Sequence, residues 1–241
     1  MKYVIISDIH SNLEALEAVA RTFPSLEECK ILCAGDIVGY GADPGPCIDI
    51  CRSMGITSVR GNHDAAVLEK TNIFFFNGSA VRAVLWTKRN LETSRKDVLE
   101  GLPLVIMGPD ITVVHGTLHQ PEEFLYMMTE LEAARTFELL KGRICFVGHS
   151  HVPGVYSLKD GKIEYTYTNR MKLDKFGKYI VNVGSVGQPR DNDNRACYCV
   201  YDTEAEEIEF YRIEYDIQKA HDKIIKAGLP AILGERLHKG I

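Results

Sequence analysis

Five short apolar runs of the sequence each end in a cluster of acidic, amide or imidazole side chains. The runs span residues 3–6, 31–34, 56–59, 111–114 and 144–147, and their length and composition predict buried strands. Ligands bind beyond the carboxyl ends of the strands in an open α/β sheet, so we expect the clusters to meet at one site. The clusters hold five of the eight histidines. Their members are Asp8, His10, Asp36, Asn62, His63, Asp64, His115, His149 and His151.

The remaining pattern predicts alternating strands and helices first, then hairpins. Helical spacing follows a Ser11–Glu14 capping box, begins again at Pro46, and returns over 77–91 and 129–140. Hairpin signals join 104–107 to 111–114 and 154–158 to 162–168, and strands at 179–183, 196–201 and 208–213 precede a helix over 216–227. We therefore predict one α/β domain, residues 1–241, in which two mixed β-sheets pack face to face and are flanked by helices, an αββα sandwich.

The net charge limits the partners of the chain. There are 28 Lys and Arg against 33 Asp and Glu, a difference of −5. An acidic chain has no broad field for a nucleic-acid backbone, so we expect no stable binding to nucleic acid. No apolar run is long enough to span a bilayer, and the N-terminus becomes polar too early for a signal peptide. We expect a cytoplasmic protein without a membrane partner.

The seven cysteines form no Cys-x-x-Cys pair, and their number is odd. A scattered set of this kind, without secretory context, predicts reduced thiols that fill the core. Metal binding through these thiols is the alternative. Reduced thiols also favour the cytoplasm.

The donor types in the five clusters indicate a metal centre. Carboxylates, imidazoles and one amide oxygen, without thiolate, suit divalent Mn, Fe or Zn. Seven candidate ligands are too many for one tetrahedral site and suit two ions about 3.5–4 Å apart that share a carboxylate, for which Asp36 is the natural bridge. The glycines before Asp36, Asn62 and His149 allow tight turns that aim each ligand into the site.

Charge at such a centre favours a phosphate ester as the ligand. Two divalent ions and the carboxylates of Asp8 and Asp36 leave a formal excess of about +2, a local anion trap. The ions would acidify a bridging water to hydroxide near neutral pH and stabilise an in-line displacement. Any one of the histidines alone would more often be a surface or hydrogen-bonded core residue. The ordered set of clusters is what points to a metal.

The clusters give five motifs in order: Asp8-Ile9-His10, Gly35-Asp36, Gly61-Asn62-His63-Asp64, His115-Gly116 and Gly148-His149-Ser150-His151. Over residues 1 to about 190, this set resembles the calcineurin-like metallophosphoesterase superfamily. The resemblance implies two packed mixed sheets. It also implies that Asp8, His10, Asp36 and His151 hold one metal, and that Asp36, Asn62, His115 and His149 hold the other.

The resemblance also implies roles for His63 and Asp64. His63 would contact the phosphate and assist the leaving oxygen as a general acid or hydrogen-bond donor. Asp64 would orient His63. A helix N-cap is the alternative for Asp64, and both roles are compatible.

The second motif separates branches of the superfamily. Protein Ser/Thr phosphatases and diadenosine tetraphosphate hydrolases carry an arginine shortly after it, and residues 35–41 hold none. Residues 35–44 and 182–190 instead resemble small prokaryotic phosphodiesterases. Arg190 is the candidate substrate clamp, because a guanidinium can grip two phosphate oxygens; a solvated loop charge beside Asp191 is the equal alternative. Tyr40 either stacks on a base or sugar or anchors its loop.

Two aromatic segments lie outside these motifs. Phe74-Phe75-Phe76 is similar to a cofactor box, but its position favours core or a dimer contact. Residues 124–128 form either a lid over the substrate or a helix packed on the sheet.

We expect a dinuclear metal-dependent phosphoesterase that hydrolyses small phosphodiesters or nucleotide phosphates by attack of a metal-bridging hydroxide. Diadenosine-tetraphosphatase-like or phosphomonoesterase activity is the alternative. A scaffold protein that reuses the fold would have lost ligands, and none of the seven is replaced. A DNA nuclease is disfavoured by the net charge. Assembly into a homo-oligomer is compatible with the sequence.

Overall fold

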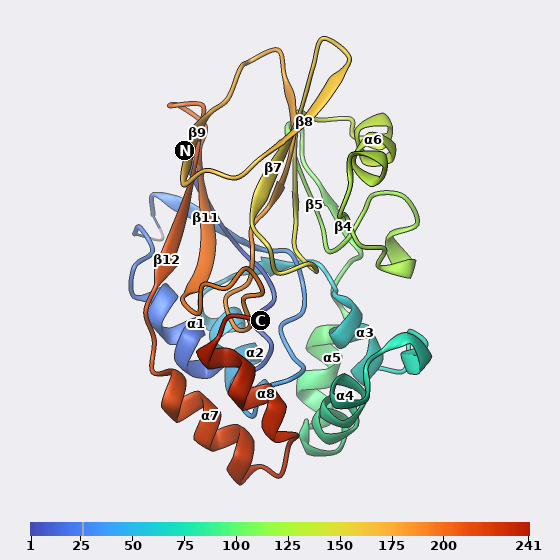
Figure 1. Ribbon diagram of the computed structural model, residues 1–241, viewed down its shortest axis with the longest axis vertical. Coiled ribbons are helices and arrows are strands. Elements are labelled where there is room, and N and C mark those ends of the chain that lie inside the picture. The colour runs from blue at the N-terminus through green and yellow to red at the C-terminus, as the bar shows by residue number, and fades with distance from the viewer. Residues whose placement is uncertain (26) are drawn as a thin grey trace.

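Two six-stranded β-sheets form the centre of the protein in the computed structural model, which describes residues 1–25 and 27–241 (Figure 1). A shared apolar core lies between them. Helices flank the pair of sheets. The predicted α/β sandwich of two mixed sheets is confirmed.

The first sheet joins a parallel half to an antiparallel half. In spatial order its strands are β3 (Thr57–Ser58), β2 (Cys29–Cys33), β1 (Lys2–Ile6), β11 (Ala196–Asp202), β12 (Glu207–Ile213) and β9 (Arg170–Lys172). Strands β3, β2 and β1 run parallel, and β11, β12 and β9 continue in antiparallel pairs. Parallel strands end at the same edge, so the residues that follow β1, β2 and β3 share that edge.

The second sheet repeats this arrangement. In spatial order its strands are β4 (Val105–Met107), β5 (Ile111–Val114), β6 (Ile144–Val147), β10 (Lys178–Asn182), β7 (Gly154–Lys159) and β8 (Lys162–Thr166). Strands β5, β6 and β10 run parallel. The pairs β4–β5 and β7–β8 are the two predicted hairpins. The residues that follow β5 and β6 therefore also share one edge.

Alternate residues of the central strands face different cores. In β1, Ile6 packs toward the helices outside the first sheet, whereas Ile5 packs between the sheets. In β6, Phe146 faces the core between the sheets, and Val147 packs with Phe137 of α6 (Glu130–Leu139). Because side chains alternate along a strand, one apolar run serves both faces of its sheet.

The helices cover the outer faces of the sheets and one end of the molecule (Figure 1). Besides α6, they are α1 (Leu13–Ala20), α2 (Pro44–Ser53), α3 (Asn62–Val67), α4 (Gly78–Asn90), α5 (Thr93–Glu100), α7 (Ile217–Lys226) and α8 (Ala231–Glu235). Helix α1 contacts β11 and β12, and α6 contacts β7, β8 and β10. The C-terminal helices α7 and α8, red in Figure 1, contact each other, and α7 packs against α1.

The start of α1 differs from the predicted capping box. Asn12, not Ser11, is the N-cap, and its Oδ1 accepts from the backbone N–H of Ala15 at 3.1 Å. Ser11 has a φ of 55° and belongs to the turn that leaves β1. The Glu14 carboxylate forms ion pairs with α7 instead of closing a capping box. The prediction of Ser11 as the cap is wrong because the turn extends one residue further than the pattern indicates.

Other element boundaries differ from the predicted ones by a few residues. Helix α2 begins at Pro44 rather than Pro46, whereas Asn77 and Thr129 cap α4 and α6 where the pattern placed them. The sequence pattern did not predict α5, α8 and β9, and it indicated α3 only through the alternative of Asp64 as an N-cap. These elements are short or polar and carry little hydrophobic periodicity.

All seven cysteines are buried with free thiols, and they belong to the three apolar cores around the sheets. The prediction that they fill the core is confirmed. Within residues 1–25 and 27–241, no helix is long and apolar enough to cross a membrane.

Candidate metal centre

The polar clusters meet where the parallel strands of both sheets end. Asp8 and His10 follow β1, and Asp36 follows β2. The third cluster opens α3, and the last two follow β5 and β6. Each side chain is at most 9% exposed. The residues brought into this region are Asp8, His10, Asp36, Asn62, His63, Asp64, His115, His149 and His151.

The backbone is strained at five of these positions. Residues with φ near +50° to +70° are uncommon outside glycine and cost roughly 1–3 kcal/mol each. Such strain persists where the surrounding structure holds a functional site in place. The left-handed turns redirect the chain as it leaves each strand. The φ angles are 52° at Asp8, 48° at His10, 55° at Asp36, 67° at His149 and 62° at His151.

Close packing, more than tight turning, explains the glycines beside the candidate ligands. Gly35 has a φ of 97°, as a tight turn requires. Gly61 has an extended backbone with a φ of −93°, and a Cβ there would overlap the Asp36 carboxylate. A Cβ on Gly148 would overlap the Asp8 carboxylate. The expectation of a tight turn is therefore wrong at Gly61, which is needed for close approach. At Gly148 the Ser150 N–H donates to the Gly148 carbonyl at 2.8 Å and closes a tight turn.

The carboxylates of Asp8 and Asp36 each have one oxygen that accepts a backbone hydrogen bond and one oxygen that faces the histidines. Oδ2 of Asp8 accepts from the backbone N–H of His149 at 3.0 Å. Oδ1 of Asp36 accepts from the backbone N–H of His63 at 2.8 Å. The second oxygens, Oδ1 of Asp8 and Oδ2 of Asp36, face imidazole nitrogens. Each carboxylate is thus held by the chain and presents a single oxygen to the site.

Backbone carbonyls fix the tautomers of three imidazoles. A carbonyl oxygen only accepts, so the Nδ1 atom that contacts it carries the proton. In the neutral ring the lone pair then lies on Nε2, which points into the site. Second contacts of this kind orient metal-binding histidines in general. The pairs are His10 with the Val38 carbonyl at 3.2 Å, His115 with Ala34 at 2.7 Å, and His151 with Gln188.

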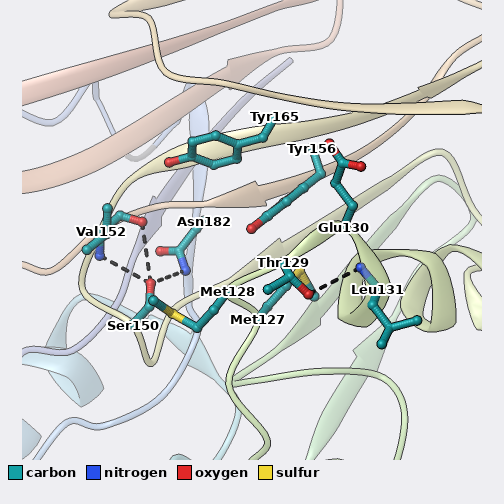
Figure 2. Close-up of a pocket in the computed structure, with 10 residues that line it drawn as sticks. All are labelled: Met127, Met128, Thr129, Glu130, Leu131, Ser150, Val152, Tyr156, Tyr165 and Asn182. Atoms are coloured by element: carbon teal, nitrogen blue, oxygen red, sulfur yellow. Dashed lines mark hydrogen bonds between the residues drawn. The ribbon is translucent and has the colours of Figure 1, made fainter.

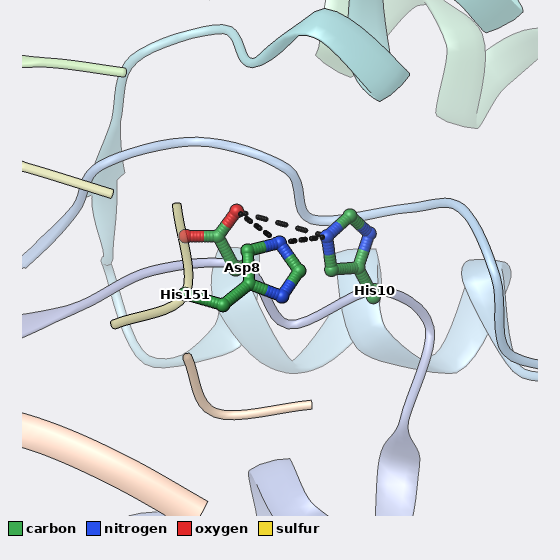
Figure 3. A group of neighbouring side chains, drawn as sticks. All are labelled: Asp8, His10 and His151. Atoms are coloured by element: carbon green, nitrogen blue, oxygen red, sulfur yellow. Dashed lines mark hydrogen bonds and ion pairs between the residues drawn. The ribbon is translucent and has the colours of Figure 1, made fainter. Parts of the chain in front are cut away.

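The first group of donors consists of Asp8, His10 and His151, whose side chains lie close together (Figure 3). The Nε2 atoms of His10 and His151 face each other at 3.1 Å. Oδ1 of Asp8 lies 3.2 Å from the His151 Nε2 and 3.6 Å from the His10 Nε2, and no donor of the described residues hydrogen-bonds to it. Electron pairs that face each other in this way need a cation between them. The donor set fits a divalent metal ion.

The second group shares a carboxylate with the first. Nε2 of His115 lies 3.0 Å from the Asn62 Oδ1, 3.1 Å from the His149 Nδ1 and 3.4 Å from the Asp36 Oδ2. The same Asp36 oxygen lies 3.6 Å from the His10 Nε2. Asp36 therefore stands between two sets of nitrogen and oxygen donors.

Burial prepares most of these groups to bind a cation. It lowers the pKa of His10, His149 and His151, so these rings are neutral at pH 7. Burial opposes ionisation of Asp8, but the neighbouring His151 and His115 together outweigh it and bring the pKa of Asp8 to about 2. Burial also disfavours a charged His115, yet Asp36 raises the pKa of His115 to about 9. A metal ion would take the place of that proton.

A model of the calcineurin-like phosphoesterase superfamily domain matches residues 1–206. The chain belongs to this superfamily. It is a metal-dependent hydrolase of phosphoric esters. The resemblance inferred from the motifs is confirmed.

Relatives of this phosphoesterase match nearly its whole length. An uncharacterized protein of Methanocaldococcus jannaschii is 43% identical over 240 residues, which cover 98% of this chain and 97% of the relative. The crystal structure of a metallophosphoesterase from Sphaerobacter thermophilus has a TM-score of 0.86 and 36% identity, with 100% and 99% covered. A hypothetical protein from Pyrococcus horikoshii shares the fold, with a TM-score of 0.82, 18% identity, and 100% and 98% covered.

His63 lies beside the donors of the phosphoesterase site. Its ring centroid is 4.8 Å from that of His10 and 4.5 Å from that of Tyr40. Its Nδ1 has no hydrogen-bond partner in the described part of the chain. Burial, opposed by Asp36, lowers the pKa of His63 to about 4. The ring is therefore neutral at pH 7.

Asp64 contacts backbone and not the His63 ring. Its two carboxylate oxygens accept from the N–H groups of Asp36 at 2.9 Å, Val38 at 3.1 Å and Gly61 at 3.0 Å. The expectation that Asp64 orients His63 is not met by these contacts, since backbone amides occupy both oxygens. The expected capping role is met in part, because Asp64 caps the start of α3 from its third position. Asp64 also fixes the turn that carries Asp36.

Arg190 and Tyr40 lie next to the donors. The Nη2 of Arg190 donates to the Tyr40 hydroxyl at 3.1 Å, and its backbone N–H donates to the His151 carbonyl at 3.3 Å. The Tyr40 ring is 6% exposed and lies 4.4 Å from the His10 ring. Asp191 pairs with Arg212 and not with Arg190.

A cleft of about 730 Å³ opens beside the donors. Asn62, His63 and His149 form its floor on the side of the metal centre. Two loops provide aromatic walls, with Phe75 from one and Tyr126 from the other. The Tyr126 ring stacks on His149 at 3.8 Å and is 49% exposed.

A second cavity, of about 610 Å³, is lined on one side by Met127 and Met128 (Figure 2). Ser150, between His149 and His151 in the chain, is part of its wall, and its Oγ accepts from the Asn182 side-chain amide at 2.8 Å. The other lining residues are mainly apolar or aromatic: Met127, Met128, Thr129, Glu130, Leu131, Val152, Tyr156 and Tyr165.

The two aromatic segments differ from the expectations in part. Residues 124–128 form a loop, not a helix packed on the sheet, and this loop separates the two cavities. Phe74 and Phe75 are 82% and 87% exposed, so the expectation of core is wrong for them. Phe76 packs on His63 at 5.0 Å. A dimer contact through Phe74 and Phe75 stays a prediction.

Sequence reasoning missed several residues that shape the site. Ala34, Val38 and Gln188 act through backbone carbonyls, which no residue type encodes. Arg236 lies over the Tyr40 ring, 5.4 Å from its centroid, although it comes from the far end of the chain. Only a tertiary structure reveals such a contact.

Proposed function

We propose that this phosphoesterase hydrolyses small phosphodiesters or nucleotide phosphates at a centre of two divalent cations that share Asp36. The observation that carries the proposal is the position of the Asp36 Oδ2, 3.6 Å from the His10 Nε2 and 3.4 Å from the His115 Nε2. One oxygen that serves two donor groups is the arrangement expected of a bridging ligand.

The proposed ligands follow the two donor groups. Asp8, His10, Asp36 and His151 would hold one ion. Asp36, Asn62, His115 and His149 would hold the other. When bound, such ions polarise phosphoryl oxygens and lower the pKa of water. Manganese, iron and zinc all suit this donor set.

His63 is proposed to contact the phosphoryl group or the leaving oxygen. Its backbone is tied to Asp36, and its ring lines the cleft. The neutral ring suits a hydrogen-bond donor to an oxygen that gains charge. Asp64 is proposed as a positioning residue, because it holds the turns of Asp36 and Gly61.

The surroundings of the centre favour a small substrate. The cleft of about 730 Å³ has the size of a small-molecule pocket, and its aromatic walls suit a flat leaving group such as a nucleoside. Two divalent ions and two carboxylates leave a formal charge of about +2 for a phosphate. Arg190 is proposed as a further phosphate contact. Reduced, buried thiols support a cytoplasmic location.

The test is a substrate panel with Mn²⁺ added. We expect hydrolysis of bis-p-nitrophenyl phosphate to exceed that of p-nitrophenyl phosphate, and we expect EDTA to abolish both. Cyclic nucleotides and dinucleoside polyphosphates complete the panel. Asp36→Asn is the matched negative control. Hydrolysis that survives chelation, or preference for the monoester, would contradict the proposal, and elemental analysis that finds one ion per chain would contradict the shared centre.

A further inference from the structure

His149 is held differently from the other three imidazoles of the candidate centre. In His10, His115 and His151, Nδ1 contacts a backbone carbonyl and Nε2 faces the site. His149 instead presents its Nδ1, which lies 3.1 Å from the His115 Nε2. When that Nδ1 binds a cation, the ring proton must lie on Nε2. Within residues 1–25 and 27–241 no group hydrogen-bonds to this Nε2, so no carbonyl fixes the orientation of the His149 ring.

A tyrosine ring supports His149 where the carbonyl is missing. The Tyr126 and His149 rings are stacked, with centroids 3.8 Å apart and planes inclined by 21°. Stacked rings restrict each other's rotation, and such pairs contribute more than the area that they bury. The ring contacts of His10, His115 and His151 are tilted or edge-on. The parallel stack therefore belongs to the one imidazole that lacks a carbonyl contact.

The loop of residues 124–128 is anchored on both sides of Tyr126. Phe124 is buried, meets the His115 ring edge-on at 6.0 Å, and has a left-handed φ of 50°, which is uncommon for a bulky residue. Met127 is buried in the same apolar core as Phe137 of α6. The Tyr126 ring is half-exposed, but its backbone is tied between two buried residues.

The backbone of this loop also lies against the motif that contains His115. A Cβ on Gly116 would overlap the Leu125 carbonyl oxygen, so glycine is needed for the loop to approach. The loop therefore contacts both imidazoles of the second donor group, His115 through Phe124 and His149 through Tyr126. In the described part of the chain, no aromatic contact joins this loop to the imidazoles of the first group.

We propose that Tyr126 is a positioning residue for His149, and that the loop of residues 124–128 thereby sets how tightly the second donor group binds its cation. The proposal rests on the proposed function, which assigns a cation to that group. Partners that orient metal-binding histidines change metal affinity when they are removed. The first donor group, whose imidazoles are fixed by carbonyls, should not depend on Tyr126. The two ions would then differ, since only one is held through a half-exposed loop residue.

Metal binding tests the role of Tyr126 without catalysis. Protein stripped with EDTA is titrated with Mn²⁺, and the free ion is followed by electron paramagnetic resonance. Asn62→Ala removes an oxygen of the second donor group alone and so identifies the binding event of that group. We expect Tyr126→Ala to weaken this event roughly 3- to 10-fold and to leave the other unchanged. Tyr126→Phe keeps the ring and should bind both ions as the native protein does.

Turnover gives a second readout. With limiting Mn²⁺, Tyr126→Ala should hydrolyse bis-p-nitrophenyl phosphate more slowly than the native protein, and excess Mn²⁺ should restore kcat. Met128→Ala, at the exposed end of the same loop, is the matched control and should need no additional Mn²⁺. A loss of kcat in Tyr126→Ala that excess Mn²⁺ does not restore would contradict a role through His149.

The His149 ring can also be observed without metal, by nuclear magnetic resonance of protein with isotope-labelled histidine. Tyr126→Ala should shift the ring signals of His149 and leave those of His10 and His151 in place, because only His149 loses a stacked neighbour. Native affinity for both ions in Tyr126→Ala, or equal weakening in Tyr126→Phe, would overturn the inference. If the native protein binds no second ion while the His149 signals alone still shift, the proposed shared centre fails and the positioning role of Tyr126 stands.

Discussion

The backbone N–H of His63 donates to the Asp36 Oδ1 at 2.8 Å, and this bond ties the residue proposed to contact the substrate to the shared carboxylate. The other Asp36 oxygen is left to face His10 and His115. One side chain therefore combines two roles, since it positions the start of α3 and presents an oxygen atom to both donor groups.

Because Asp36 and His63 have different proposed roles, we expect different defects in the Asp36→Asn and His63→Gln variants. Asp36→Asn removes the shared negative charge, so metal content and activity should fall together. His63→Gln leaves every proposed ligand in place, so metal content should persist while turnover falls roughly 10²–10⁴-fold. Elemental analysis and kcat on the same preparations make the comparison. Comparable metal loss in the two variants would show that His63 belongs to the coordination sphere.

The candidate metal centre could be predicted from the sequence because its residues follow parallel strands. Asp8, Asp36 and His115 each follow an apolar run, and parallel pairing brings the ends of such runs to shared edges. Residue type then identifies the donors. The two sheets follow from the same alternation of strand, helix and hairpin.

What the sequence does not predict depends on tertiary contacts. Arg236 meets Tyr40 only because the C-terminal helices pack on its loop. Asp64 fits both a catalytic and a capping role by type, and only the structure shows backbone amides at both of its oxygens. Ser11 and Asn12 are both good N-caps, and the turn after β1 selects Asn12.

Gly61 should tolerate no side chain. A Cβ there would overlap the Asp36 carboxylate, so Gly61→Ala should displace this proposed shared ligand and destabilise the fold by roughly 1–3 kcal/mol. Gly78, in α4, has open space around it, so Gly78→Ala is the matched control. Urea unfolding and metal content are the measurements. A Gly61→Ala protein with full metal content and wild-type stability would show that the carboxylate is free to move.

Metal removal should lower thermal stability. Without a cation, the Nε2 atoms of His10 and His151 face each other at 3.1 Å beside Asp8. An ion that binds only the folded state adds about 2.7 kcal/mol at 100 times its Kd. We expect Tm to fall on EDTA treatment and to recover with Mn²⁺ but not with Na⁺. If the protein is first shown to hold metal and its Tm then does not change on chelation, a site of this kind is contradicted.

The Glu14 carboxylate should make stability depend on pH through its contact with the C-terminal helix. It lies 2.7 Å from Lys223 and 3.1 Å from Lys219, and its side chain is only 4% exposed. Burial opposes ionisation, but the bonds from Lys223 and Lys219 outweigh it and lower the pKa of Glu14 below its ordinary 4.5. The folded state therefore binds this proton less readily than the unfolded chain. The stabilisation is fully present above about pH 4.5 and is lost as pH falls through the lower, folded pKa.

Glu14→Gln should accordingly destabilise the protein by roughly 1–3 kcal/mol at pH 7 and have a smaller effect at pH 3.5. Lys223 keeps its second partner, Asp43 at 2.8 Å, which limits the loss. Glu17→Gln, whose carboxylate pairs with Arg21 on the exposed surface of α1, is the control. Urea unfolding of both variants across this pH range provides the measurement. A constant difference between Glu14→Gln and the native protein from pH 7 to pH 3.5 would mean that packing, and not the charge of Glu14, holds α1 to α7.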